Sequence, residues 1–373
     1  MNQEKPKYEI IKDDILSRIR SGNFSYEEVL CTEKQLSEQY QVSRITAKRA
    51  ITDLENLGVL IRKRGVGSFV ARNAMNNLNR TSSFSTKVSK MVSFLLPFDI
   101  TKGGMFQTVE VINNALNANG YIMSIYVSGG KEKTNLKLLL SQNLSGLVYY
   151  PERDKINLNL LNEFVFAQIP VVVIDKTTDC PYIHNIVSDN FEGGKLLANH
   201  LLSLGHRNIV FLTTVPLEET STVRNRFGGF LHAMQKAGFP PSPSSLVSYG
   251  RELTDQDAIT GGSQIQEILK NLYNSGVTAI IAENDVVAYR LRIACHALGL
   301  HIPEDLSICG FDKANVAESQ GLTSIQQDFN LIGEEVSRIL TCTMDDPNFP
   351  CQKIVLPVHL AVGDTTGAPR TLG

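Results

Sequence analysis

A basic segment near the N-terminus carries side chains that suit contact with a polyanion. Residues 44–72 hold seven Lys or Arg and two Asp or Glu, in a chain of 373 residues whose formal net charge is −2. Arg44 and Lys48 are about one helical turn apart, and Arg49 follows directly. Arginine can donate two hydrogen bonds to a guanine edge, and either cation can pair with a phosphate. The cluster therefore predicts a nucleic-acid partner for this segment.

The sequence around this cluster predicts three short helices. Residues 7–21 place apolar side chains at helical spacing, and a second helix follows Thr32, where T-E-K-Q matches a capping box. The third helix begins at Ser43, a good N-cap residue, and stops at Gly58. Its apolar positions share one face, namely Ala47, Ala50, Ile51, Leu54 and Leu57. The basic residues are left largely outside that face, where they can reach a ligand.

A predicted β-hairpin follows the third helix. Two short β-type runs, 59–62 and 68–71, flank Gly65 and Gly67 at a basic tip. Three helices and such a hairpin form a winged helix-turn-helix, whose reading helix enters the major groove of DNA. Glycines at the tip would let its backbone approach a duplex closely. The caps, turn, basic helix and hairpin together favour this interpretation over a solvated charged face.

The same residues resemble a known family. Residues 7–71 are similar to the GntR-type winged helix, through Thr32-Glu33, Val42-Ser43-Arg44, Thr46 to Ile51, Gly58-Val59-Leu60 and Gly65 to Val70. The family usually has Arg where this chain has Lys48, and a lysine loses the bidentate geometry of arginine. The resemblance and the charges together predict contacts to operator DNA from Glu33, Arg44, Thr46, Lys48, Arg49, Arg64, Gly65 and Gly67.

The pattern changes after a stretch rich in Asn, Ser and Thr. Residues 1–72 form the predicted DNA-binding domain, 73–90 a linker and 91–373 a second domain. In the second domain apolar runs alternate with helical stretches, which predicts parallel sheets covered by helices on both faces. The second domain has about 280 residues, which is long for a single sheet of this kind, so we expect two α/β lobes. Their predicted bounds are 91–187 with 327–342, and 188–325 with 345–366.

The second domain also resembles a known family. Residues 91–362 are similar to the effector domain of LacI/GalR regulators, which shares the periplasmic-binding-protein fold. The motifs that carry the resemblance are Val187 to Gly194, His200 to Ile209, Arg226 to Phe230, Asn284 to Ala288, Ile302 to Asp312 and Leu322 to Ile325. The resemblance implies a sugar-responsive regulator, most simply a repressor. It would act as a homodimer on operator DNA and bind a small sugar between its lobes.

Six residues are predicted to bind the effector. By family position, Arg226 would donate two parallel hydrogen bonds and Asp285 would accept from two hydroxyls. Phe106 matches the aromatic residue that family members stack on the ligand. The remaining three, with Phe329 as a further candidate, fall at strand ends or crossovers, where open α/β sheets bind ligands: Phe98, Asp175 and Gln327.

Other functional classes have less support in the sequence. The six cysteines have no CxxC spacing, and no nucleophile–base pair or phosphate loop is visible, so we expect neither an enzyme nor a metal or cofactor site. The polar start predicts no signal peptide, which favours the cytoplasm over a transport-type sugar-binding protein. A nucleobase or sugar-phosphate effector stays open, although no extra Lys/Arg cluster for a phosphate is apparent.

Overall fold

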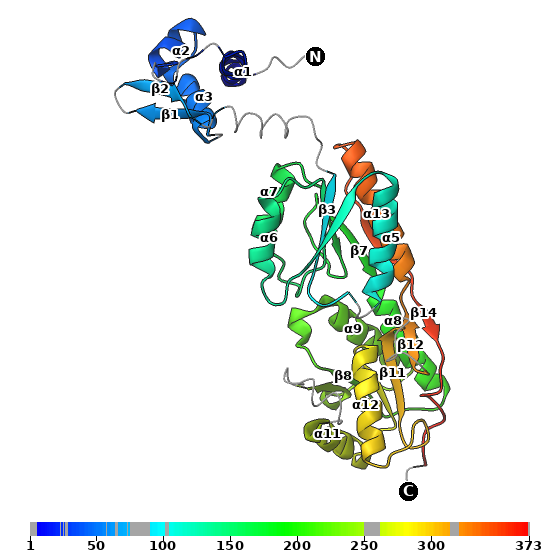
Figure 1. Cartoon of the computed structure of the whole chain (residues 1–373). Coiled ribbons are helices and arrows are strands. Elements are labelled where there is room, and N and C mark those ends of the chain that lie inside the picture. The colour runs from blue at the N-terminus through cyan, green and yellow to red at the C-terminus, as the bar shows by residue number, and fades with distance from the viewer. Residues whose placement is uncertain are drawn as a thin grey trace. The chain divides into compact units, whose positions relative to one another are not determined.

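The chain divides into two compact units, Met1–Val88 and Ser89–Gly373. Figure 1 draws both units of the computed structural model. The residues that the structure describes are 6–22, 24, 26, 29–56, 58–63, 66–72, 74, 90–100, 104–249, 262–313 and 321–371. The predicted linker 73–90 therefore lies outside the described residues, except for Ala74 and Lys90. Among the described residues, no helix has both the length and the apolar character needed to cross a bilayer.

The first unit is the predicted winged helix-turn-helix. Its elements are α1 (Lys7–Arg20), α2 (Glu33–Gln39), α3 (Arg44–Asn56), β1 (Leu60–Lys63) and β2 (Gly67–Val70). The two strands pair antiparallel and form the wing. The three helices and both strands contribute to one apolar core, so the helices and the wing fold as a single body.

The predicted helix caps are present. The Gln35 amide donates to the Thr32 hydroxyl at 3.2 Å, and the Thr32 amide donates to the Gln35 side chain at 2.9 Å, which completes the capping box. At the next helix the Thr46 amide donates to the Ser43 hydroxyl at 3.2 Å. Gly58 follows α3 with a φ of +64°, a conformation that glycine adopts at little cost. These contacts fix both ends of α3 within the unit.

The second unit contains two lobes, each built on a six-stranded sheet. In lobe one the strand order is β13-β7-β6-β5-β3-β4, and all neighbours are parallel. The strands are β3 (Met91–Leu96), β4 (Ile122–Val127), β5 (Gly146–Tyr149), β6 (Val171–Ile174), β7 (His184–Ser188) and β13 (Lys353–Leu356). Helices α5 (Met105–Ala118) and α13 (Phe329–Asp345) share one core, and α6 (Glu132–Leu140) and α7 (Leu158–Phe166) share another.

Lobe two repeats this plan. Its strand order is β14-β12-β11-β10-β8-β9, parallel except for β14 at the edge. The strands are β8 (Ile209–Thr213), β9 (Leu246–Ser248), β10 (Ala279–Ala282), β11 (Ser307–Asp312), β12 (Thr323–Gln326) and β14 (His359–Ala361). Helices α8 (Asn190–Ser203) and α9 (Ser221–Lys236) share one core with this sheet. Helices α11 (Ser263–Asn274) and α12 (Asp285–Ala297) belong to the second core. The doubly wound, two-lobed fold predicted from the sequence is thus confirmed.

One predicted lobe boundary is wrong. Residues 345–366 were predicted to belong to lobe two, but β13 pairs with β7 in the sheet of lobe one. The chain therefore crosses between the lobes after β7, after β12 and after β13. The reason is that β13 covers an edge of the lobe-one sheet that β7 would otherwise leave unpaired. Lobe two regains the chain at β14, and Thr365 further along bonds to Ile308 and Thr323 of the same sheet.

Two glycines allow helices α8 and α9 to pack with their backbones almost in contact. A Cβ atom on Gly194 would lie 1.9 Å from the carbonyl oxygen of Arg226, and one on Gly229 would lie 2.0 Å from that of Phe191. Only a residue without a side chain fits at these positions. The sequence pattern alone predicted no structural role for the glycine pairs of this region. Their role is to bring α9, and with it Arg226, close to the start of α8.

We expect Gly229→Ala to destabilise the second unit by about 1–3 kcal/mol, because its Cβ would overlap backbone atoms that cannot move aside. Gly228→Ala is the matched control, since its Cβ would lie at an ordinary 3.6 Å from the Phe191 ring. Both substitutions gain the same helix propensity, so their difference reports packing alone. Chemical denaturation measures it, and equal midpoints for the two variants would contradict the packing argument.

Candidate effector cleft and DNA-binding surface

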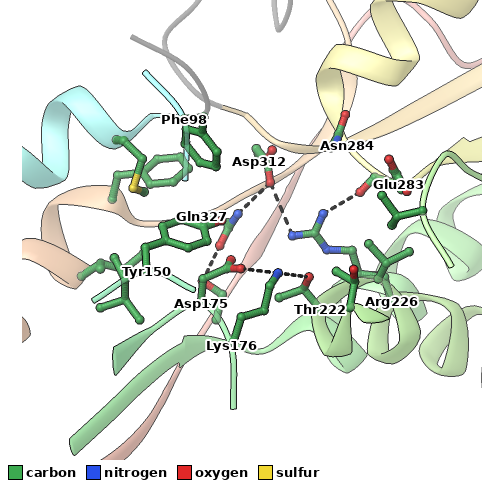
Figure 2. A pocket seen from close by; sticks show the side chains of 18 of the residues that line it. Phe98, Tyr150, Asp175, Lys176, Thr222, Arg226, Glu283, Asn284, Asp312 and Gln327 are labelled. Atoms are coloured by element: carbon green, nitrogen blue, oxygen red, sulfur yellow. Dashed lines mark hydrogen bonds and ion pairs between the residues drawn. The ribbon is translucent and has the colours of Figure 1, made fainter. Parts of the chain in front are cut away.

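A cavity of about 430 Å³ lies between the two lobes, within the size range of small-molecule sites. Its lining includes residues that directly follow strands of both sheets, such as Tyr150 after β5, Asp175 after β6 and Glu283 after β10. The carboxyl ends of parallel strands are where open α/β sheets bind ligands. Figure 2 shows the polar side chains that meet there. The geometry is that of a ligand cleft closed from two sides.

Arg226 on α9 makes three polar contacts at the edge of the cleft. Its guanidinium donates to the Asn190 side chain at 2.8 Å and to the Glu283 carbonyl at 2.5 Å, and it pairs with Asp312 at 3.5 Å. Figure 2 shows the contacts with Glu283 and Asp312. The same group lies 3.6 Å from the centre of the Phe311 ring. Only 6 % of the residue is exposed. These contacts hold the guanidinium in one orientation at the edge of the cavity.

A chain of hydrogen bonds continues from Asp312 into lobe one. The Gln327 amide donates to Asp312 at 2.7 Å, and the Ser188 hydroxyl donates to the Gln327 oxygen at 2.6 Å. Ser188 ends β7 and Gln327 follows β12, so both stand where the chain passes between the lobes. The network therefore couples the cleft to the crossover segments. A ligand that displaced Asp312, Gln327 or Ser188 from this network would change the contacts of the crossover segments.

We expect Asp312 to contribute stability to the second unit that is lost as the pH rises from about 4 to about 7. Burial raises the pKa of Asp312 to about 7, against the opposing effect of Arg226, whereas the unfolded chain releases this proton near 3.8. In that window Asp312 holds its proton in the folded chain but not in the unfolded one, so its contribution to the free energy of unfolding falls with rising pH. Asp312→Asn removes this contribution. Denaturation midpoints of both proteins across the window measure it, and parallel pH profiles would contradict it.

A buried lysine bridges the two lobes. Lys176 is 6 % exposed, and its ammonium donates to Asp175 at 2.7 Å and to the Thr222 hydroxyl at 3.1 Å. Lys176 follows β6 of lobe one, whereas Thr222 lies on α9 of lobe two (Figure 2). On the lobe-one side, Phe98 and Tyr150 meet edge to face with ring centres 5.2 Å apart. The cleft thus combines polar pairs with an aromatic surface.

A second group of contacts joins the lobes beside the cavity. Asp154, in the loop after β5, accepts from the Ser221 hydroxyl at 2.7 Å and from Arg224 at 3.2 Å. The neighbouring Arg153 pairs with Glu219 at 2.9 Å. Ser221 and Arg224 are on α9, and Glu219 ends the short helix η1 (Leu217–Glu219). Together with Lys176, these contacts show that the lobes touch across the cleft as well as along the crossovers.

Four of the six predicted effector residues line the cavity, namely Phe98, Asp175, Arg226 and Gln327. Phe106 does not, and its prediction is corrected. It lies near the start of α5 with 56 % of its surface exposed, and the preceding residue, Met105, lines the cavity instead. Successive residues of a helix point about 100° apart, so a shift of one position exchanges the inward and outward side chains.

The prediction for Asp285 is corrected as well. Its carboxylate accepts from the Ser324 hydroxyl at 2.6 Å and from the Lys313 amide at 2.9 Å, and the residue is 3 % exposed. The side chain therefore ties the start of α12 to β12 and to the end of β11. The two preceding residues, Glu283 and Asn284, line the cavity. The motif lies at the cavity, but the Asp285 side chain stabilises the fold of lobe two and does not line the cavity.

Several lining residues were not predicted from the sequence. They share a position at or just after a strand, or at the start of α9, and comprise Tyr150, Glu152, Lys176, Thr222, Glu283 and Asp312. The strand-end rule that selected Asp175 could also have selected Lys176, the next residue. Thr222 carried no such signal, because its place in the cleft depends on how α9 packs against α8.

The predicted DNA-contacting residues of α3 lie at its exposed N-terminal half. Arg44, Lys48 and Arg49 are exposed, and Thr46 is half-buried. The Arg49 guanidinium stacks at 4.0 Å on the Tyr8 ring of α1, which restrains its direction. The Thr46 hydroxyl lies 2.9 Å from that of Ser43, so it takes part in the helix cap. Arg44 and Lys48 are thus the exposed cations of this helix that the described contacts leave most available to DNA.

The other predicted DNA contacts belong to α2 and to the wing. Glu33 begins α2 and pairs with Arg62 of the wing at 3.4 Å. Arg64 and Gly65 lie outside the described residues. Gly67 has a φ of +148°, and a Cβ there would lie 2.4 Å from the Val29 side chain. Gly67 is therefore required for packing inside the domain, whatever it contributes at a duplex.

Known proteins resemble both units of the chain. Residues 7–70 match the model of bacterial regulatory proteins of the gntR family, and residues 198–366 match the periplasmic binding protein-like domain. An arabinose metabolism transcriptional repressor of Geobacillus stearothermophilus is 28 % identical over 90 % of each chain. The first of these matches contains the whole described winged helix.

Solved structures with the same fold are transcriptional regulators. The lac repressor dimer, bound to operator and the anti-inducer ONPF, is 25 % identical with a TM-score of 0.63, covering 78 % of this chain and 99 % of that one. A LacI family regulator from Enterococcus faecium with bound ribose is 24 % identical with a TM-score of 0.64, covering 74 % and 99 %. These relatives are regulators and not enzymes. The chain thus joins a gntR-type DNA-binding domain to a periplasmic binding protein-like domain, and the relative that it resembles over most of its length is a transcriptional repressor.

Proposed function

We propose that this regulator is a repressor that leaves its operator when a small neutral sugar, such as arabinose, binds between its lobes. The observation that carries the proposal is the cleft at the strand ends of both sheets, with Arg226 and Gln327 held beside an aromatic pair. Fixed donors and acceptors suit the hydroxyls of a sugar, and an aromatic surface suits its C–H face. The names of the relatives described above, with arabinose metabolism and ribose, support the same ligand class.

The charges of the cleft favour a neutral ligand. Among the described lining residues, the carboxyl groups are Glu152, Asp175, Glu283 and Asp312, and the cations are Lys176 and Arg226. Each cation already pairs with a carboxylate of the cleft. A phosphate would therefore meet an excess of negative charge and no unpaired cation within this lining. This arrangement disfavours a sugar-phosphate effector.

Closure of the lobes gives the ligand a way to act. A ligand shifts an equilibrium only by binding one state better than the other, and a sugar that contacts both lobes favours the closed state. The contacts of Lys176 with Thr222 and of Asp154 with Ser221 exist only while the lobes are together. Coupling between two sites in such systems is typically ~1–3 kcal/mol, enough to change operator affinity severalfold or more.

The proposal includes a homodimer that acts in the cytoplasm on a two-fold symmetric operator. An edge strand supports self-association, because β4 exposes 67 % of Ile122, 40 % of Ile125 and 49 % of Val127. Apolar side chains on an open sheet edge are usually covered by a partner. Sedimentation of the full chain tests this part, and a monomer at micromolar concentration would contradict it.

The ligand class is tested by thermal shift. The full chain is heated with pentoses, hexoses, disaccharides, nucleobases and sugar phosphates, one at a time. A ligand present at about 100 times its Kd stabilises the folded state by about 2.7 kcal/mol, which moves the midpoint clearly. The proposal expects a neutral sugar to raise the midpoint and to release the protein from its operator in gel shifts. If only a nucleobase or a sugar phosphate raises the midpoint, that compound is the effector and the neutral-sugar proposal is wrong. Turnover of the ligand would indicate an enzyme.

A further inference from the structure

An isoleucine occupies the most outward position of α3. Ile45 is 81 % exposed, although it lies on the helix predicted to enter DNA. The buried face of this helix consists of Ala47, Ala50, Ile51 and Leu54, each at most 1 % exposed. At about 100° per residue, Ile45 points almost directly away from the middle of that face. Packing within the described part of the unit does not account for an apolar side chain at this position.

The surroundings of Ile45 are cationic and not apolar. Arg44 precedes it and Lys48 follows about one turn later, and both are exposed. Thr52, the next residue along this outward side, is half-buried and accepts from Arg62 of the wing at 3.3 Å. A protein-docking patch would gather several apolar side chains. A single apolar residue between cations instead matches the base-facing surface of a major-groove helix.

We propose that Ile45 is a specificity-determining residue that contacts the C5 methyl group of a thymine in the operator. The inference rests on the proposed function, in which α3 binds the major groove. In that groove thymine alone presents a methyl group, and apolar side chains recognise it by contact. Residues in the first turn of such a helix are the ones that reach base edges. Ile45 has no hydrogen-bonding group and cannot bind a phosphate, which leaves the methyl group as its partner.

The test removes the methyl group from the DNA and the side chain from the protein. The full-length chain first selects its binding sites from a random duplex library. Each thymine of the selected site is then replaced singly by deoxyuridine, which lacks only the C5 methyl. Affinities are measured for the unchanged protein, for Ile45→Ala and for Ile10→Ala. Ile10 is a matched control, because it is an isoleucine of the same unit that is 46 % exposed on α1.

At one thymine position in each half-site, replacement by deoxyuridine is expected to weaken binding of the protein to the duplex about fourfold. A loss of this size corresponds to burial of one methyl group. Ile45→Ala should bind the thymine and deoxyuridine duplexes equally well, whereas Ile10→Ala should still prefer thymine. This double-mutant cycle isolates the interaction between Ile45 and the methyl group. The unfolding midpoint of Ile45→Ala should not change. If selection succeeds and no thymine shows a loss that depends on Ile45, the inference is overturned and the proposed function stands. If the chain selects no DNA at all, the proposed function fails first.

Discussion

We expect replacement of Arg226 with alanine to abolish effector binding, so that the protein stays on its operator at every sugar concentration. The side chain is 6 % exposed beside the cavity and is held by Asn190, by the Glu283 carbonyl and by Asp312. Its planar group can donate parallel hydrogen bonds to neighbouring hydroxyls, which alanine cannot replace. Operator affinity without sugar should remain, because DNA contacts are assigned to the first unit. Gel shifts across a sugar titration measure both properties, and normal release by Arg226→Ala would remove this residue from the effector site.

The substitution also has a structural cost that must be separated from ligand binding. Arg226→Ala leaves Asp312 buried without its cation, which costs up to about 3–5 kcal/mol where the carboxyl stays charged and less where it takes up a proton, as its raised pKa allows. The double variant Arg226→Ala with Asp312→Asn removes that unpaired charge. It should recover much of the stability and none of the sugar response. Lys236→Ala is the surface control on the same helix, since Lys236 is an exposed cation in the last turn of α9.

The sequence predicted the framework of the protein better than the lining of its cleft. Periodicity and caps were enough for the winged helix, because the Thr32 box and the Ser43 cap are local interactions between near neighbours. The long apolar strands of both lobes were found for the same reason. The crossover at β13 was not, since its pairing with β7 joins segments far apart in the sequence. With four residues, β13 is also too short to give a clear periodic signal.

The cleft residues show that a family motif locates a residue near the cavity but does not determine whether its side chain faces the ligand. Arg226 lines the cavity, because its motif fixes a position on a helix that packs tightly through Gly194 and Gly229. Asp285 does not, since its carboxylate is bound by Ser324 and by the Lys313 amide. Neither partner is close to Asp285 in the sequence. Whether a side chain faces a ligand or the framework depends on such long-range contacts, which a motif does not contain.

We expect replacement of Arg44 with alanine to weaken specific operator binding strongly and to leave the response of the second unit to sugar unchanged. Arg44 is the exposed first residue of α3, next to Ile45, and the Ser43 cap fixes the direction in which the helix starts. A bidentate contact from arginine to guanine contributes about 1–3 kcal/mol of discrimination. In a dimer the loss occurs in both half-sites, so the affinity should fall by about 2–6 kcal/mol in total. Binding to a selected site and to scrambled DNA, with sugar-induced thermal shift in parallel, measures the two properties separately.

Two further variants distinguish a base contact of Arg44 from a phosphate contact. Arg44→Lys keeps a positive charge but loses the planar fork, so a base contact predicts that specific binding stays low. Lys48→Ala should instead weaken binding to every sequence and reduce the slope of log affinity against log salt by about 1 for each phosphate that Lys48 neutralises. Recovery of specific binding by Arg44→Lys would show that Arg44 serves only as a charge against the backbone. In that case base recognition by this helix would depend on other side chains of its first turn, with Ile45 directly beside Arg44 as the remaining exposed candidate.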